Sequence, residues 1–435
     1  MLFERKDAMA VNVLLIGGGG RAHAVAWRLS QSPDIGTLYI APGNTGTEWV
    51  GTNVDIPETD IGALLQFALQ NKIGIAIPLS EQSLAAGIVD AFRDRNLPIF
   101  GPTRLAADIE ASKVLGKRLM NLSGIPTPEW NIAQSYDEAM FWISRATFPV
   151  VIKCSGLAHG KGVSICKNFD EAERTLKRFM LDQVFGDAGK QVIIEQYVAG
   201  PEFSIHALCS RDNYILFPPA QDHKNIFDNG EGPMTGGMGA IAPLPWLSSD
   251  HLWYAKNYVA LTLKKLQSEG RAFTGCLYPG FKKTPQGLFI LEYNARFGDP
   301  EAQVFMRLLT TDLLAMILAS VRGGLGGINV AWFSGYAVCV ELVTEGYPNR
   351  PPQRNRLPIS GIQDAERIPG VVVFHGNTAG TSSSTILTNQ GRVLSVTAVG
   401  DTPQIAIETV YKAVRCIEFE GMHYRTDIGH SCLTS

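Results

Sequence analysis

Three polar side chains follow an apolar run in the second half of the chain and could do chemistry together. Leu288–Leu291 is apolar, and Glu292, Asn294 and Arg296 follow it at every second position. On a strand, side chains at this spacing share one face. Carboxylate and amide oxygens are hard ligands that suit Mg²⁺, or Mn²⁺ in its place, shared with nucleotide phosphates. Arg296 can clamp a carboxylate or phosphate through its planar guanidinium. We therefore predict Glu292 and Asn294 as metal ligands and Arg296 as a catalytic residue.

Two glycine-rich turns could bind phosphate. Gly17–Gly20 lies between an apolar run and a helical pattern at Arg21–Gln31, where backbone N–H groups and the helix dipole favour an anion. Ser155–Val163 carries Lys161, but it lacks the Ser or Thr that follows the lysine of a Walker P-loop. The segment Leu38–Asn44 offers no acid for the ribose of NAD, so a dinucleotide site is disfavoured.

Two further segments are candidates for ligand contact. Gln221–Lys224 and Gly232–Gly239 form a polar, glycine-dense stretch, and its length favours a functional loop. Gly236 and Gly237 would let the backbone approach a small substrate closely. Ile193–Glu202 predicts a strand, a connector and a second strand. The backbone of such a connector can contact an adenine edge, although an ordinary strand turn explains the pattern equally well.

The elements that must position these residues change character along the chain. Over roughly the first hundred residues, short apolar runs at Thr37–Ile40 and Ile73–Ile77 alternate with helical patterns at Ile61–Gln70 and Leu84–Arg95. This alternation predicts a parallel α/β sheet. The middle mixes hairpin-like strands with longer helices, which indicates α+β architecture. Gly323–Gly327 is the best linker candidate, and further strands and a helix follow it.

Composition excludes several classes of function. The 435 residues predict two to four compact units, and 45% hydrophobic with 18% charged residues is typical of a globular protein. A net charge of −3 gives no basic footprint for nucleic acid. No run approaches the ~20 apolar residues of a membrane span. Seven cysteines without a C-x-x-C pair suggest reduced thiols, so we expect a cytoplasmic protein. With nucleic acid and membrane disfavoured, we expect its partners to be small-molecule substrates. The sequence sets no oligomeric state.

Together these segments resemble the ATP-grasp superfamily and, within it, the glycinamide ribonucleotide synthetase family. The resemblance runs from Val11 nearly to the end of the chain. The blocks that carry it are Leu15–His23, Ala41–Asn44, Phe100–Pro102, Gly156–Val163, Gln221–Lys224, Thr235–Gly239, Glu292–Glu301, Glu345–Pro348, Phe374–His375, Gly391–Leu394 and Thr426–Gly429.

The resemblance implies a multidomain α/β and α+β protein. It would have an N-terminal parallel α/β domain over 11–109, an ATP-grasp domain over 110–327 and a small C-terminal α+β domain over 328–435. The implied reaction joins glycine to 5-phosphoribosylamine, with cleavage of ATP to ADP and phosphate. It also implies Asp222 and Lys153, beside Arg296, as catalytic residues. The residues implied to bind ATP are Lys113, Lys153, Gly160, Lys161, Gly162, Glu195, Gln196, Tyr197, Val198 and Glu202. Those implied to bind the other substrates are Gly19, Gly20, Arg21, Asp222, Lys224, Gly236, Gly237, Arg296, Gly298 and Asp299.

The chain departs from the family pattern mainly in its N-terminal part. Ala22 stands where the family carries a glutamate, and Pro78–Leu84 differs from the usual Val-Gly-Pro-Glu-Ala-Pro-Leu. Loss of one polar partner can cost about 1–3 kcal/mol, enough to change the choice of amine. Two alternatives therefore stand beside the main interpretation. One is a related ligase that uses another amine or small carboxylate, and the other is a non-catalytic nucleotide-binding module.

Overall fold

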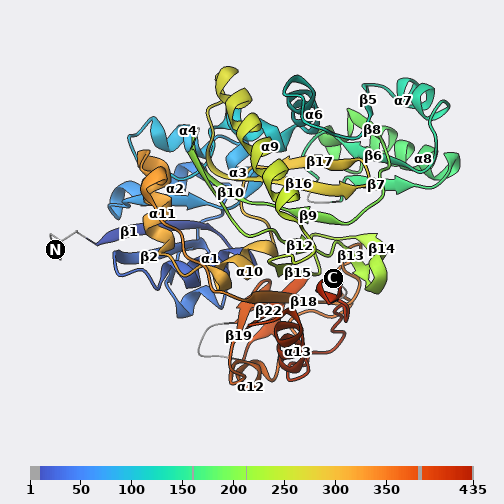
Figure 1. The fold of residues 1–435 in the computed structure, drawn as a ribbon. Coiled ribbons are helices and arrows are strands. Elements are labelled where there is room, and N and C mark those ends of the chain that lie inside the picture. Colours follow the sequence, from blue (N-terminus) through green and yellow to red (C-terminus); the bar gives the residue numbers. More distant parts are fainter. Residues whose placement is uncertain (1–9, 159–160, 212, 381–384, 434–435) are drawn as a thin grey trace.

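The computed structural model describes residues 10–158, 161–211, 213–380 and 385–433, and its elements form four larger sheets (Figure 1). Gly160 and most of the serine-rich segment 381–385 lie outside the described residues. Within the described part, no helix is long and apolar enough to cross a membrane. All seven cysteines are free thiols, and six of them are buried.

The N-terminal sheet is parallel, with strand order β3-β2-β1-β4. Its elements are β1 (Val11–Gly17), α1 (Gly20–Leu29), β2 (Ile35–Pro42), β3 (Thr52–Asn53), α2 (Ile61–Gln70), β4 (Ile75–Pro78), α3 (Glu81–Ala85) and α4 (Ile88–Arg93). β1 is apolar throughout because both of its faces are buried. Val13 and Leu15 pack on the side of α1, and Leu14 and Ile16 pack on the side of α2 and α4. The predicted parallel α/β arrangement is confirmed.

One predicted helix is wrong in its extent. Leu84–Arg95 forms two short helices, α3 and α4, because Gly87 has the left-handed φ of +89° between them. A left-handed residue ends a helix, and glycine adopts that conformation without steric cost.

The middle of the chain builds two antiparallel sheets (Figure 1). The smaller, β5-β8-β6-β7, packs with α7 and α8 around its own apolar cluster. The larger contains β11-β10-β16-β17, and β9 pairs with β16. Their elements are α5 (Arg104–Ala111), α6 (Lys113–Leu122), β5 (Trp130–Ala133), α7 (Tyr136–Ile143), β6 (Val150–Cys154), β7 (Val163–Cys166), α8 (Phe169–Leu176), β8 (Val192–Gln196), β9 (Glu202–Ser204), β10 (Ala207–Ser210), β11 (Asn213–Leu216), α9 (Ser249–Ser268), β16 (Thr274–Thr284), β17 (Gly287–Asn294), α10 (Glu301–Leu308) and α11 (Leu313–Arg322).

The last sheet combines the C-terminal part with two strands from the middle. Its order is β12-β15-β18-β22-β19, so β15 pairs with β18 across the glycine-rich segment that was predicted as a linker. Its elements are β12 (Gln221–Asp222), β15 (Gly239–Ala242), β18 (Tyr336–Val343), α12 (Ile362–Glu366), β19 (Val371–His375), β22 (Arg392–Gly400) and α13 (Pro403–Val414). Two short pairs complete the chain, β13 (Asn225–Phe227) with β14 (Glu231–Met234) and β20 (Thr378–Ala379) with β21 (Leu387–Thr388).

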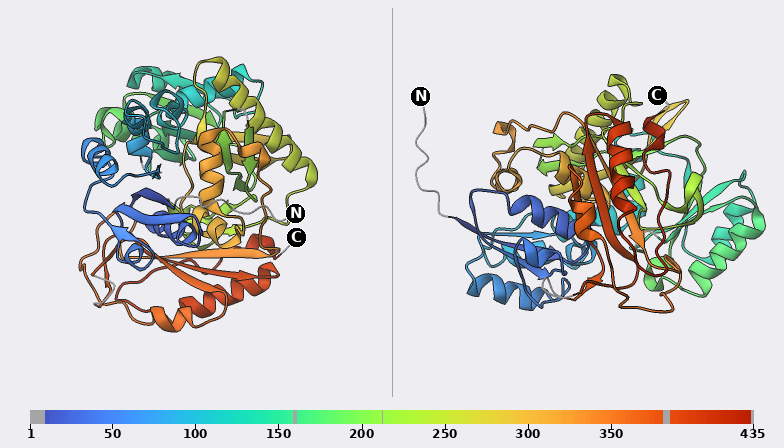
Figure 2. Two further views of the ribbon diagram at one scale, coloured as in Figure 1. Left: turned by 90° about the vertical axis from the view of Figure 1, so that its left-hand side faces the viewer. Right: turned by 90° about the horizontal axis from the view of Figure 1, so that it is seen from below.

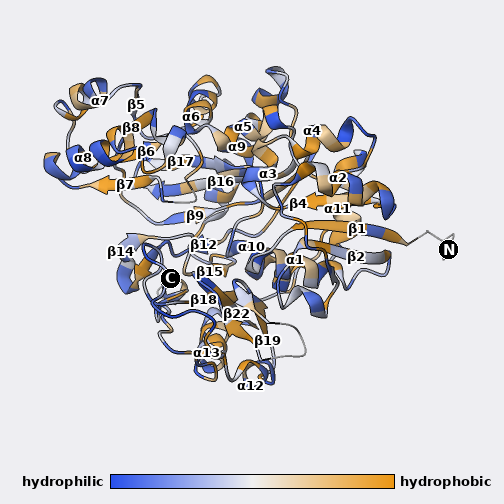
Figure 3. Ribbon diagram, turned by 180° about the vertical axis from the view of Figure 1, so that it is seen from behind, coloured by the Kyte–Doolittle hydropathy of each residue, from blue (hydrophilic) through white to orange (hydrophobic). Residues whose placement is uncertain are grey.

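The N-terminal sheet and the C-terminal sheet lie side by side, as both views in Figure 2 show. α1 packs against α10 and β19, so the two ends of the chain share one apolar cluster. Apolar colouring is concentrated in strands such as β1 and β4, and α8 is largely hydrophilic (Figure 3). The predicted domain boundaries at 109/110 and 327/328 stay predictions.

Candidate functional site

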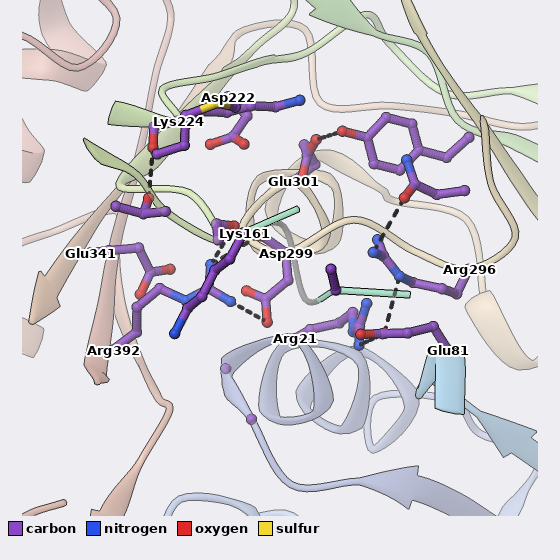
Figure 4. Close-up of a pocket in the computed structure, with 18 of the residues that line it drawn as sticks. Arg21, Glu81, Lys161, Asp222, Lys224, Arg296, Asp299, Glu301, Glu341 and Arg392 are labelled. Atoms are coloured by element: carbon purple, nitrogen blue, oxygen red, sulfur yellow. Dashed lines mark hydrogen bonds and ion pairs between the residues drawn. The ribbon is translucent and has the colours of Figure 1, made fainter. Parts of the chain in front are cut away.

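A cavity of about 410 Å³ lies where the sheets meet (Figure 4). It is lined from the N-terminal part by the turn before α1, from the middle by β17 and the loop before β7, and from the C-terminal sheet by β18 and β22. The structure brings most of the sequence-predicted residues to its wall. These are Gly19, Gly20, Arg21, Lys113, Lys161, Gly162, Asp222, Lys224, Gly236, Glu292, Asn294, Arg296 and Asp299.

Glu292 and Asn294 project from the last part of β17 into this cavity. Burial alone would raise the pKa of the Glu292 carboxyl, but Lys224, Lys153 and Lys113 outweigh it and lower the pKa to about 2. The carboxylate is therefore ionised at neutral pH, as a metal ligand must be. The described residues contain no group of three or more His, Cys, Asp or Glu side chains suited to a metal. A divalent cation held by Glu292 and Asn294 would complete its coordination with water and phosphate oxygens.

Arg296 lies just beyond the end of β17, yet it remains beside Asn294. Its Nη2 donates to Asn294 Oδ1 at 3.3 Å and lies 3.1 Å from Glu110 Oε1. Its Nε lies 3.4 Å from Glu81 Oε2, and Nη1 donates to the carbonyl of Phe297 at 3.3 Å. Burial would lower the Arg296 pKa, but Glu110 and Glu81 outweigh it and raise the pKa. Much of the guanidinium is therefore occupied by protein groups, which fix its orientation.

Glu81 and Glu110 line the cavity although neither was predicted as a site residue; Glu81 lies in the segment Pro78–Leu84, which was noted only for its difference from the family pattern. Glu81 begins α3 and Glu110 lies near the end of α5, so both come from elements far from Arg296 in the sequence. Glu110 also accepts the backbone N–H of Ala295 at 2.8 Å. Arg21 reaches the same cluster, because its Nη1 donates to the Phe297 carbonyl at 2.6 Å. These contacts tie the N-terminal elements to the segment that follows β17.

Four lysines approach the site from different elements. Lys113 donates to the carbonyl of Gly156 at 3.3 Å, and Lys161 donates to the carbonyl of Pro348 at 3.0 Å. Lys224 lies 3.7 Å from Glu292 Oε1 and 3.8 Å from Glu202 Oε2. Lys153 is buried, does not line the cavity, and lies 2.6 Å from Glu195 Oε2.

The predicted adenine-contact segment lies outside the cavity wall. The Glu195 side chain is buried between Lys153 and Lys117, with Lys117 Nζ 2.8 Å from Glu195 Oε1. Gln196 is exposed, and Tyr197 and Val198 are half-buried. Glu202 lines a smaller recess that adjoins the main cavity.

The glycine-dense loop between β12 and β15 approaches the site through its backbone. Gly237 has a φ of +117°, and a Cβ there would lie 2.7 Å from Asp222 Oδ1. Gly237 itself does not line the cavity; it leaves room for Asp222, which does. Gly298 likewise lies behind the wall, where its N–H donates to His206 Nε2 at 2.9 Å.

Arg392 of β22 anchors this loop and was missed as a site residue, although its block carried part of the family resemblance. Its Nη1 donates to the carbonyls of Gly236 and Asp299 at 3.0 and 2.9 Å. Its Nη2 lies 3.0 Å from Asp299 Oδ2, an ion pair visible in Figure 4. Burial would raise the Asp299 pKa, but Arg392 and Arg21 outweigh it and lower the pKa. The other lining residues that sequence reasoning missed include Tyr278, Glu301, Glu341 and Tyr347.

Two of the residues that depart from the family pattern, Ala22 and Ser80, do not reach the cavity, whereas a third, Met234, lines it. Ala22 and Ser80 are buried, and neither is among the described residues that line the wall. Ala22 instead packs beside Gly17: a Cβ added to Gly17 would lie 3.2 Å from the Cβ of Ala22.

The fold and the site define an ATP-grasp protein: two antiparallel sheets lie beside a cavity in which Glu292 and Asn294 are approached by lysines. Residues 11–110, 111–302 and 337–431 match the N domain, the ATP-grasp (A) domain and the C domain of phosphoribosylglycinamide synthetase. The chain belongs to the phosphoribosylglycinamide synthetase family.

Named relatives agree over nearly the full length. A phosphoribosylamine–glycine ligase of Rhodopirellula baltica is 40% identical over 432 residues, which cover 98% of each chain. The same enzyme of Chlorobaculum tepidum is 40% identical over 97% of this chain and 100% of its own. The crystal structure of phosphoribosylamine–glycine ligase from Thermotoga maritima superposes with a TM-score of 0.83 at 30% identity, covering 96% of this chain and 100% of that one.

Proposed function

We propose that this protein joins glycine to 5-phosphoribosylamine in an ATP-dependent reaction of purine biosynthesis, giving glycinamide ribonucleotide, ADP and phosphate. The observation that carries the proposal is the ionised Glu292 beside Asn294, on a cavity wall approached by Lys113, Lys161 and Lys224. The full-length relatives named phosphoribosylamine–glycine ligase support it. We also propose that the reaction takes place in the cytoplasm.

The chemistry requires activation of a poor electrophile. The glycine carboxylate attacks the γ-phosphate of ATP, ADP leaves, and glycyl phosphate forms. The amine of phosphoribosylamine then attacks the acyl carbon and displaces phosphate. Lysines around the phosphates would stabilise the negative charge on the transferring group.

Mg²⁺ fits the donor set at Glu292 and Asn294, which are oxygen ligands on one edge of the cavity. When bound, the metal would neutralise charge on the phosphates. The protein's own part is to hold the ligands in place: Arg296 donates to Asn294 Oδ1 and so fixes the amide. Because an acyl phosphate hydrolyses readily, the loop over 155–163 would exclude water from it.

We assign the remaining roles on the same basis. Lys113, Lys153, Lys161 and Gly162 would contact ATP phosphates, Glu195–Val198 the adenine, and Glu202 the ribose. Asp222 and Arg296 would contact glycine. The alternative of a different amine acceptor rested on Ala22 and on the segment Ser80–Ser83. Of these residues only Glu81 lines the wall, and the family pattern also carries a glutamate at its position.

One experiment tests the proposal. The protein is incubated with Mg-ATP and glycine, with and without 5-phosphoribosylamine, and ADP and product mass are followed. Glycinamide ribonucleotide is the expected product. Glycyl hydroxamate trapped by hydroxylamine without that product would instead indicate another amine, and ATP binding without turnover would indicate a non-catalytic module.

Glu292→Ala should lower turnover by at least about a hundredfold, because the ionised ligand and its charge are lost. Glu408→Gln removes an exposed carboxylate from α13 and serves as the matched control. An unchanged rate in Glu292→Ala would remove the metal assignment.

A further inference from the structure

A hairpin beside the cavity carries one of the site lysines. β13 and β14 form a two-stranded pair in which Asn225 lies opposite Met234. Lys224 precedes β13, and both Lys224 and Met234 line the cavity. The backbone N–H of Thr235 donates to the carbonyl of Lys224 at 2.7 Å, so the two ends of the hairpin are joined at the cavity wall. The position of Lys224 therefore depends on where the hairpin lies.

The hairpin has little apolar packing of its own. Ile226 belongs to a small buried cluster with Met238 and Val343. Phe227 and Asn229 are exposed. A two-stranded hairpin is at best marginally stable in water, so contacts with the rest of the chain must fix its place. The last part of the chain, red in Figure 1, lies beside β13 and β14.

An arginine and an aspartate in the C-terminal segment 423–429 hold the first strand and the turn of this hairpin. Arg425 donates to both carboxylate oxygens of Asp427, at 2.7 and 2.6 Å. Its Nη1 donates to the carbonyl of Asn225 at 3.0 Å, and Asp427 Oδ2 accepts the N–H of Asn229 at 2.8 Å. Burial would raise the pKa of Asp427, but the hydrogen bonds from Arg425 and Asn229 outweigh it and lower the pKa to about 2. The Asp427 carboxylate is therefore ionised at neutral pH.

Two other residues of the segment add to this contact. The N–H and the hydroxyl of Thr426 both donate to the carboxylate of Asp228, the N–H at 2.8 Å. His423 Nε2 donates to the carbonyl of Ile226 at 2.9 Å. The segment thus contacts the hairpin along its first strand and at its turn.

The segment itself is anchored on the C-terminal sheet and its helix. His423 and Val343 of β18 exchange both backbone hydrogen bonds, at 2.9 and 3.0 Å. The Tyr411 hydroxyl on α13 donates to the carbonyl of Arg425 at 2.9 Å and accepts the N–H of Ile428 at 3.0 Å. The C-terminal part of the chain therefore contacts the hairpin from a fixed base.

We propose that Arg425 and Asp427 are positioning residues that hold the hairpin β13–β14, and with it Lys224, at the cavity wall. This gives a role to the block Thr426–Gly429 of the family resemblance, although none of these four described residues lines the cavity. Lys224 Nζ lies 3.7 Å from Glu292 Oε1, so a hairpin that moves away removes this cation from the proposed metal ligand. The inference rests on the proposed ligase function for its kinetic consequence.

Hydrogen exchange tests the contact without any substrate. Asp427→Asn keeps the size of the side chain and removes the charge that pairs with Arg425. The backbone amides of 225–234 should exchange at least about tenfold faster than in the wild type, because local opening of the hairpin becomes easier. Glu420→Gln is the matched control, since it also removes a carboxylate from an arginine, Arg354, but both of these side chains are exposed. Its exchange over 225–234 should match that of the wild type.

A kinetic double-mutant cycle tests the positioning of Lys224. Asp427→Asn should lower kcat for glycinamide ribonucleotide formation about tenfold, because a lysine beside the transferring phosphate acts in the transition state. The KM values for ATP and glycine should change less than about threefold. In a Lys224→Gln background, Asp427→Asn should lower kcat less than about twofold, since no lysine is left to be displaced. A residue with a merely structural role would lower kcat by the same factor in both backgrounds.

The outcomes are separable. A wild type that makes no glycinamide ribonucleotide and no glycyl hydroxamate refutes the proposed function, and exchange over 225–234 still decides whether the hairpin is held. Unchanged exchange in Asp427→Asn refutes the inference whatever the activity. Faster exchange with an unchanged kcat, or with an equal loss of kcat in both backgrounds, also refutes it. If Asp427→Asn unfolds, Asp228→Ala removes the neighbouring contact with Thr426 from the hairpin side, and the same expected and refuting results apply to it.

Discussion

The buried lysine pair around Glu195 makes a quantitative test of the packing behind the site. Lys117 Nζ donates to Glu195 Oε1 at 2.8 Å and to Thr127 Oγ1 at 2.6 Å, and Lys153 Nζ lies 2.6 Å from the other carboxylate oxygen. All three charged side chains are almost fully buried. Lys117→Met keeps the length of the side chain and removes its charge.

The loss of unfolding free energy expected for each variant depends on which of the three buried charges keep an ionic partner. Glu195 keeps Lys153 when Lys117 is replaced, so the loss is one charge-assisted hydrogen bond, about 2 kcal/mol of unfolding free energy. Glu195→Gln leaves two buried lysines without a carboxylate, and about 3–5 kcal/mol is expected. In the double variant only Lys153 is left unpaired, so the combined cost should be smaller than the sum by about 2 kcal/mol.

Urea unfolding of the four proteins, followed by both circular dichroism and fluorescence, measures this coupling. The two probes should give coincident transitions before the free energies are compared. Costs that add to within about 0.5 kcal/mol would refute the idea that Glu195 is held by both lysines. The KM for ATP should rise in Glu195→Gln, where Lys153 loses its carboxylate, and stay within about twofold in Lys117→Met.

Three other predictions concern the loop, its anchor and pH. Gly237→Ala should raise the KM for glycine at least about tenfold, because the added Cβ would collide with Asp222 Oδ1. Gly270→Ala is the control: Gly270 also has a positive φ but lies in open space, so its replacement should change stability and leave the KM for glycine unchanged. Arg392→Gln should lower kcat/KM about a hundredfold through loss of the Asp299 ion pair and the loop carbonyl contacts, and unaltered kinetics would contradict the anchoring role. Burial chiefly lowers the pKa of three histidines to about 3, 4 and 4: His23, His223 and His375. The unfolded chain takes up these protons near pH 6.5 and the folded chain does not, so stability should fall by about 2 kcal/mol per histidine from pH 7 to pH 5. A urea midpoint that does not decrease over this range would contradict that assignment.

The position of Glu292 and Asn294, the proposed metal ligands, was predictable because it depends on the local sequence pattern alone. Alternation along an apolar strand places Glu292 and Asn294 on one face whatever the rest of the chain does, and the structure has both on β17 at the cavity. The same alternation placed Arg296 on the strand, but β17 ends at Asn294. The parallel N-terminal sheet was also predictable from the sequence, because each of its strands and helices has its own hydrophobic pattern.

The acids around Arg296 were not predictable in this way. Glu110 lies in a helix and contacts Ala295 and Arg296 from nearly two hundred positions away in the sequence. Nothing in the local pattern distinguishes it from a carboxylate on an exposed helix face. Only the packing of α5 against β17 turns Glu110 toward the site. The pairing of β12 and β15 with the C-terminal sheet was not predicted either, because it also joins segments that lie far apart in the sequence.

That pairing has a consequence for how the enzyme is made. The loop between β12 and β15 is synthesised long before β18, the strand that β15 pairs with. A nascent chain that ends before β18 can therefore assemble its N-terminal sheet and the sheets that carry Lys153 and Glu292, while Gly236 and Gly237 still lack the support of Arg392. Gly236 and Gly237 therefore gain the support of Arg392 only after β22 has been synthesised, and a fragment cut at the glycine-rich segment lacks that support.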